Sequence, residues 1–130
     1  MPKVPVISIV DDDEPVREAT KGLVRSLGYV AATFASSEEF LNSDRVNDTS
    51  CLITDVQMPG LNGLELQSRL TAMGRRIPII FVTAFPQEQA RVRALKAGAV
   101  GFLSKPFSDD SLILCLDRAL ADNNRNGVEQ

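Results

Sequence analysis

Five short apolar runs, each followed by a segment with helically spaced apolar residues, constrain the fold of this 130-residue chain more than any other feature. The runs are rich in valine, isoleucine and leucine, and their lengths suit single buried strands. Strands that alternate with helices favour one parallel sheet with helices on both faces and right-handed crossovers. The predicted strands are 4–10, 29–34, 50–54, 77–82 and 99–104, and the predicted helices are 15–27, 36–41, 62–73, 86–97 and 109–121.

The length of the chain predicts one α/β domain, which we place at residues 1–121. Residues 42–49 are polar and are expected to form a loop. Residues 122–130 are polar and unpatterned, which indicates a tail or the start of a linker. Local signals mark several helix ends. An acidic residue before Pro15 and the hydroxyl of Ser36 are suitable N-caps, and Asp109 and Asp110 are expected to cap the last helix. Met73 is expected among the apolar positions of the third helix.

The composition of the chain excludes several classes of function. The formal net charge of −3 gives no basic footprint for nucleic acid, so we expect contact with DNA only through a separate domain. No apolar run has membrane-spanning length and the N-terminus lacks a signal-peptide pattern, so no membrane association and a cytoplasmic location are expected. The absence of histidine excludes a Ser/His/Asp triad and most zinc sites on this chain. Cys51 and Cys115 are predicted to be small buried hydrophobes.

The informative polar residues follow the predicted strands, where parallel strands share one edge of the sheet. Close carboxylates repel one another and raise one another's pKa unless a cation offsets them, and Mg²⁺ prefers oxygen ligands. A lysine and a threonine hydroxyl are suitable partners for phosphate oxygens, and a carboxylate can become an aspartyl phosphate. We therefore predict that Asp55 carries the chemistry. An over-acidic helix cap is the simpler reading of residues 11–14 alone. The residues at the strand ends are Asp11, Asp12, Asp55, Thr83 and Lys105.

Four motifs together are similar to one family. They are IVDDDEPVR at 9–17, LITDVQMPG at 52–60 with Asn62-Gly63 after it, FVTA at 81–84 and AGAVGFLSKPF at 97–107. Over residues 4–121 the chain resembles a response-regulator receiver domain of two-component signalling, with details similar to the LuxR/FixJ type. The resemblance implies a flavodoxin-like (CheY-like) three-layer αβα fold, whose five-stranded parallel sheet has the order 2-1-3-4-5.

The resemblance also implies roles for individual residues. Asp55 is implied as the phosphoacceptor. Asp12 and Asp55 are implied as direct ligands of Mg²⁺, with Asp11 acting largely through water and the backbone carbonyl of Gln57 as a further ligand. If the first strand ends one residue later, Asp13 takes the role of Asp12 as a ligand. This second register of the acidic run stays open.

Three further residues receive roles from the same resemblance. Thr83 is expected to meet the phosphoryl oxygen and to shift on activation, and Phe102 aligns with an aromatic switch that turns inward with it. Lys105 is expected to form a salt bridge to the phosphate, and its bond to Pro106 is expected to be cis. We also hypothesise that the bulk of Phe85 limits the access of water to the site.

The implied function is a phosphorylation-controlled switch. A sensor histidine kinase is the implied phosphodonor, and the surface of the fourth helix, fifth strand and fifth helix is the implied output surface for a partner or a second copy. Such a switch would suit either a protein with a transcriptional effector domain or a stand-alone regulator. Alternatives are a haloacid-dehalogenase-type phosphatase with Asp11 as nucleophile, and a degenerate receiver that only docks. Charged residues on the two helices either pair across a dimer or form a solvated face, namely Arg91, Arg93, Lys96, Asp110 and Asp117.

Overall fold

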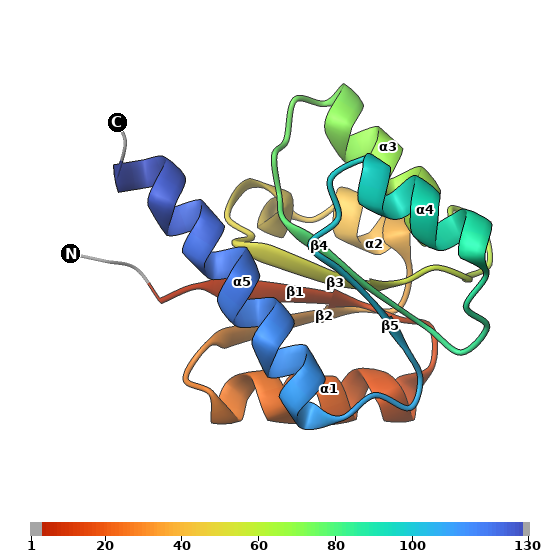
Figure 1. The fold of residues 1–130 in the computed structure, drawn as a ribbon, viewed down its shortest axis with the longest axis horizontal. Helices are drawn as coiled ribbons and strands as arrows, with labels where there is room; N and C mark the ends of the chain where they lie inside the picture. The colour runs from red at the N-terminus through yellow and green to blue at the C-terminus, as the bar shows by residue number, and fades with distance from the viewer. Residues whose placement is uncertain (1–3, 129–130) are drawn as a thin grey trace.

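A five-stranded parallel sheet forms the centre of the computed structural model, which describes residues 4–128 and the side chains of residues 4–121 (Figure 1). The strand order is β2-β1-β3-β4-β5, as the resemblance implied. Helices cover both faces of the sheet, which gives the predicted three layers. The strands are β1 (Val6–Val10), β2 (Val30–Phe34), β3 (Cys51–Asp55), β4 (Ile79–Thr83) and β5 (Gly101–Ser104). The helices are α1 (Glu14–Ser26), α2 (Ser37–Leu41), the 3-10 helix η1 (Asp44–Asn47), α3 (Gly63–Ala72), α4 (Glu88–Lys96) and α5 (Asp109–Val128).

Two apolar clusters hold the layers together. The first lies between one face of the sheet and helices α1 and α5, and includes Val24 and Leu116. The second lies between the other face and helices α2, α3 and α4, and includes Phe40, Leu66 and Ala94. The central strands β3 and β4 are buried along their whole length, as expected for parallel strands covered on both faces.

Side-chain caps begin three of the helices, and two of these caps were predicted from the sequence. The Asp13 side chain accepts a hydrogen bond from the Val16 amide, and the Ser36 hydroxyl accepts one from the Glu39 amide. Asn62 forms a reciprocal capping box with Glu65. These caps fix where α1, α2 and α3 begin relative to the strands that precede them.

The cap predicted for the last helix is wrong. Asp109 is itself the first residue of α5, so it lies inside the helix that it was expected to cap. The hydroxyl of Ser108 instead accepts a hydrogen bond from the Ser111 amide at 3.1 Å. A serine one residue before the first turn satisfies the free backbone N–H groups, while the two aspartates favour the positive end of the helix dipole.

Four other predicted boundaries differ from the structure. The expected loop at 42–49 contains η1, whose single turn is too short to show an apolar period. Met73 is half exposed because α3 ends at Ala72, and it therefore does not contribute to the core. Helix α5 continues beyond the predicted end at Ala121 to Val128. The strand predicted from residue 4 begins at Val6.

Both cysteines are buried and free, as predicted. Burial, with a smaller contribution from Cys115, raises the pKa of the Cys51 thiol to about 12, so this thiol is unreactive at neutral pH. Among the described helices, none combines the length and the apolar character that a bilayer crossing requires.

Candidate functional site

The polar residues at the strand ends converge on one edge of the sheet. The register pairs Asp55 of β3 with Val82 of β4, and Thr83 of β4 with Ser104 of β5. The same parallel arrangement places Asp11, directly after β1, beside the end of β3. Residues from four strands of the sheet therefore meet although they are far apart in the sequence.

Lys105 joins two of these strand ends. Its Nζ lies 2.9 Å from Asp11 Oδ2 and 2.9 Å from Asp55 Oδ2. All three side chains are largely buried, at 12, 3 and 9% exposure respectively. Shielding from water strengthens these ion pairs relative to pairs on the surface. The predicted cis bond between Lys105 and Pro106 is present.

The pKa values of Asp11 and Lys105 are both raised, for different reasons. Burial, the largest influence, raises the pKa of Asp11, and the nearby charge of Asp55 adds to it, against the lowering effects of the Asp13 amide and Lys105. Burial acts on Lys105 in the opposite direction, but its hydrogen bonds and charge attraction to Asp55 and Asp11 outweigh it and raise the pKa of the lysine. The charged form of Lys105 is therefore stabilised, whereas burial makes the charged form of Asp11 less favourable than it is in water.

Asp12 completes an acidic group that fits a divalent cation. Carboxylate oxygens of Asp11, Asp12 and Asp55 lie within 4.8 Å of one another. Asp11 and Asp55 are buried while Asp12 is exposed, so the group is open to solvent on one side. Oxygen ligands alone, an excess of negative charge and an open side suit Mg²⁺, which keeps several waters when it binds.

The register left open for the acidic run has a structural answer. Strand β1 ends at Val10, so Asp11 and Asp12 are the first residues beyond it. Asp13 has a different task, because its carboxylate caps α1 and its amide donates to Asp11 Oδ1 at 2.9 Å. The cluster of carboxylates therefore contains Asp12 and not Asp13.

Gln57 lies at the start of the loop after β3. Its amide donates to Asp55 Oδ1 at 3.1 Å, which holds the loop against the carboxylate. The side chain of Gln57 is exposed. Its expected role as a metal ligand through its carbonyl stays a prediction.

Thr83 and Phe102 lie on the same face of the sheet. Phe81 pairs with Phe102 in the register, and Thr83 follows Phe81 by two residues, so all three side chains point to one side. The rings of Phe81 and Phe102 are 6.1 Å apart between centroids, and both belong to the cluster beneath α4. Thr83 is buried, and its hydroxyl accepts a hydrogen bond from the Phe85 amide at 3.2 Å.

The other residues discussed from the sequence, Phe85 and five charged residues of α4 and α5, are at the surface. Phe85 follows the site but is 68% exposed. Arg91 forms two hydrogen bonds to Glu88 within α4, at 2.9 and 2.8 Å, so in this structure its guanidinium is engaged by its own helix. Pairing of Arg91 with a second copy stays a prediction.

Two contacts around the site were not predicted. The Arg17 guanidinium donates to the backbone carbonyl of Asp11 at 2.8 Å and so fixes the turn that carries the acidic pair. Gly63 lies against the backbone carbonyl of Asp55, where no other residue fits without movement. Both residues stand in or beside the motifs quoted above, but only the folded backbone shows what they contact.

Comparison with known proteins identifies the family of the chain. The response regulator receiver domain family matches residues 7–117. The response regulator protein TodT of Pseudomonas putida F1 is 44% identical over 115 residues, which are 88% of this chain and 51% of TodT. The transcriptional regulatory protein FixJ of Azorhizobium caulinodans is 35% identical over the whole chain and 62% of FixJ. In its solved structure the response regulator StyR superposes with a TM-score of 0.87 at 40% identity, covering 98% of this chain and 65% of StyR.

The chain therefore belongs to the response regulator receiver domain family of two-component systems. It spans about half the length of curated relatives such as TodT. Membership of this family identifies a signalling protein rather than a typical metabolic enzyme, so the phosphatase alternative with Asp11 as nucleophile is not supported.

Proposed function

We propose that Asp55 accepts a phosphoryl group from the phosphohistidine of a partner sensor histidine kinase, in the cytoplasm and with Mg²⁺ bound. The observation that carries the proposal is the position of Lys105 Nζ, 2.9 Å from the carboxylates of both Asp55 and Asp11. A fixed cation at this point lies where a phosphoryl group on Asp55 would place its negative charge. Preorganised charge of this kind is the main contribution that proteins make to phosphoryl transfer.

The proposed step transfers the phosphoryl group from a histidine nitrogen to a carboxylate oxygen of Asp55. A carboxylate oxygen of Asp55 attacks the phosphorus, the bond from phosphorus to the histidine nitrogen breaks, and the nitrogen leaves with the electron pair and takes a proton from water. Oδ1 of Asp55 is held by the Gln57 amide and Oδ2 by Lys105, so the carboxylate is oriented before the donor arrives. Magnesium held by Asp11, Asp12, Asp55 and the Gln57 carbonyl would neutralise charge on the transferred group.

Phosphorylation would then bias a two-state equilibrium. In the present structure the Thr83 hydroxyl accepts from the Phe85 amide, and a phosphoryl oxygen on Asp55 would give the same hydroxyl an acceptor to which it can donate. Phe102 lies on the same face, beneath α4, so a shift of Thr83 frees space into which its ring turns. The surface of α4, β5 and α5 would change as a result and bind a partner or a second copy.

The output is proposed from the relatives. TodT is a response regulator and FixJ a transcriptional regulatory protein, so control of transcription through a separate DNA-binding domain is the favoured output. A stand-alone regulator is the second candidate. The residues that follow Gln130 in the native gene distinguish the two.

Labelling with a small phosphodonor tests the proposed acceptor. The chain is incubated with acetyl phosphate and Mg²⁺, and the phosphoryl group is located by mass spectrometry. We expect it on Asp55, with loss of labelling in Asp55→Asn and no loss in Asp48→Asn, which changes an exposed aspartate on the loop before β3. Labelling that survives in Asp55→Asn would overturn the proposal.

A further inference from the structure

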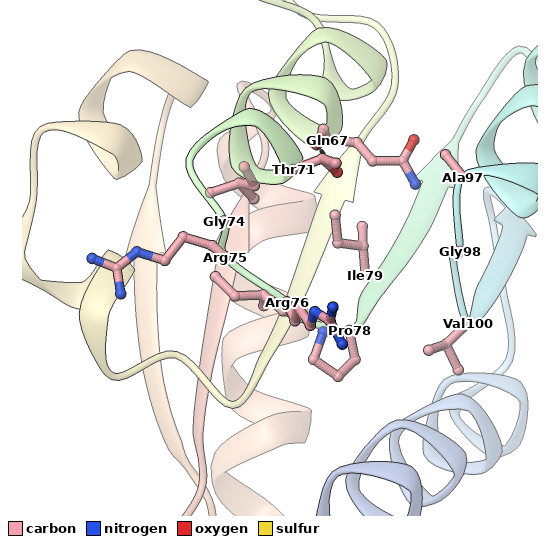
Figure 2. Close-up of a pocket in the computed structure, with 12 residues that line it drawn as sticks. Gln67, Thr71, Gly74, Arg75, Arg76, Pro78, Ile79, Ala97, Gly98 and Val100 are labelled. Carbon is pink, nitrogen blue, oxygen red and sulfur yellow. Dashed lines mark hydrogen bonds between the residues drawn. The ribbon is translucent and has the colours of Figure 1, made fainter. Parts of the chain in front are cut away.

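A pocket lies at the edge of the sheet opposite Asp55, between α3, the end of α4 and the starts of β4 and β5. Figure 2 shows Gln67 and Thr71 of α3 on one side and Ala97, Gly98 and Val100 on the other. Its volume is about 510 Å³, which is within the range of small-molecule sites. The phosphorylation chemistry proposed above uses none of these residues.

The walls of the pocket combine apolar and polar surface in comparable amounts. Ile77, Pro78 and Val100 are only half buried, so their apolar surfaces remain open to a ligand. The amide of Gln67 is 4% exposed and donates to the carbonyl of Ala94 at 3.1 Å, which joins α3 to α4 beside the pocket. An open pocket with both apolar surface and polar groups suits a small organic molecule that carries one polar group.

The charge at the pocket is positive although the whole chain carries −3. Two arginines line it and no acidic residue does. Arg75 points away from the pocket in Figure 2 and donates to Asn47 of η1. Arg76 lies along the rim beside Pro78, and within residues 4–121 it has no salt-bridge partner. A guanidinium in this position suits a carboxylate, which it can bind through two parallel hydrogen bonds.

We propose that this pocket binds a small organic anion with a flat apolar body, such as an aromatic carboxylate, whose acid group pairs with Arg76. The apolar body would contact Ile77, Pro78 and Val100, and it would touch both α3 and the end of α4. A ligand there would therefore contact the receiver on the side away from its phosphoacceptor.

The test uses naphthoate as the probe and the neutral naphthalenemethanol as its matched control. Binding to the unphosphorylated chain is followed by backbone amide NMR, which gives both the dissociation constant and the position of the ligand. We expect saturable shifts at residues 71–78 and 97–100, and weaker binding of the neutral compound. Arg76→Gln should weaken naphthoate binding about tenfold, as expected for loss of a charge-assisted hydrogen bond, and leave naphthalenemethanol unchanged.

Arg25→Gln is the control for a simple change in net charge, because Arg25 is an exposed arginine in the last turn of α1, in the opposite helical layer. It should leave naphthoate binding unchanged. Three results would overturn the proposal: no saturation up to the solubility limit of naphthoate, shifts centred outside the pocket, or equal weakening in Arg25→Gln and Arg76→Gln. Since the experiment needs no phosphoryl group, its result is independent of the role of Asp55.

Discussion

The backbone of Gly63 lies directly against the carbonyl group of Asp55, and a Cβ atom at Gly63 would overlap that oxygen. The Gly63 amide also donates to the Val56 carbonyl at 2.8 Å, so the start of α3 is fixed to the residues that carry the proposed acceptor. The absence of a side chain at Gly63 thus allows the start of α3 to lie this close to Asp55.

Gly63→Ala should therefore displace the end of β3. We expect a loss of about 1–3 kcal/mol in the free energy of unfolding, as for other overpacked sites, and reduced phosphorylation of Asp55. Urea denaturation and acetyl phosphate labelling measure the two effects. Gly22→Ala in α1 is the matched control, because a Cβ there meets nothing within 4 Å and should stabilise the chain by about 0.4–1 kcal/mol. Equal effects of the two substitutions would contradict the prediction.

Asp11→Asn should stabilise the metal-free protein at neutral pH. Burial above all raises the pKa of Asp11 over its ordinary value of 3.8, so its ionised form costs folding free energy. We expect a gain on the order of 1 kcal/mol in a chelating buffer. The difference in the free energy of unfolding between Asp11→Asn and the wild type should be largest above the raised pKa of Asp11. It should shrink as the pH falls through that pKa and vanish below 3.8.

Thermal unfolding across this pH range checks the prediction for Asp11. Asp117→Asn provides the comparison, because Asp117 is exposed on α5 and its replacement should have little effect at any pH. A lower stability of Asp11→Asn than of the wild type at neutral pH would show that its ion pair with Lys105 outweighs the cost of burial.

Mg²⁺ should stabilise the folded chain through Asp12 and not through Asp13. Binding to the folded state alone adds about 2.7 kcal/mol at roughly a hundredfold excess over the dissociation constant. Asp12→Asn should lose most of this gain. Asp13→Asn should keep it, because asparagine also caps a helix and Asp13 lies outside the acidic group. Calorimetric titration with Mg²⁺ measures binding to each variant. Loss of binding in Asp13→Asn would instead favour the alternative in which Asp13, and not Asp12, is the ligand.

Gly101→Ala should destabilise the packing of α5 on β5. A Cβ at Gly101 would lie 2.7 Å from Cys115 Sγ, which implies a cost of about 1–3 kcal/mol. The cost should fall when Cys115→Ala removes the sulfur. A double-mutant cycle in urea isolates this interaction. The same cost in both backgrounds would mean that the clash is not with Cys115.

Phe85→Ala should speed the loss of the phosphoryl group from Asp55 a few-fold if the ring shields the site from water. The ring is 68% exposed, so its removal should cost little stability, and a change in rate would report access of water. Leu114→Ala, which removes another exposed apolar side chain, is the control. An unchanged rate of dephosphorylation would exclude the shielding role.

Much of the fold followed from local patterns. Apolar β-branched runs predicted all five strands, and residues such as Ser36 and Asn62 marked helix starts because capping depends on neighbours in the chain. The strand order came from the family resemblance. The short turn η1 and the exposure of Met73 were missed, since one depends on a single turn without a period and the other on where α3 stops.

The candidate site was also predicted only in part. Residue types at the strand ends indicated which groups would meet, because parallel strands share an edge. The hydrogen bond from Arg17 to the Asp11 carbonyl and the contact of Gly63 with Asp55 depend on the path of the backbone in three dimensions. Neither has a signature in the spacing of side-chain types.

The place of β5 in the sheet gives Lys105 a further importance. Strand β5 is hydrogen-bonded to a neighbour on one side only, whereas the strand of Asp55 is held on both. Lys105 reaches from this edge, past β4, to the carboxylate of Asp55 at the end of β3 and to that of Asp11 directly after β1. A change of charge on Asp55 would therefore act, through Lys105, on an edge strand that has backbone partners on one side only. The domain can respond at its margin while its central strands stay in place.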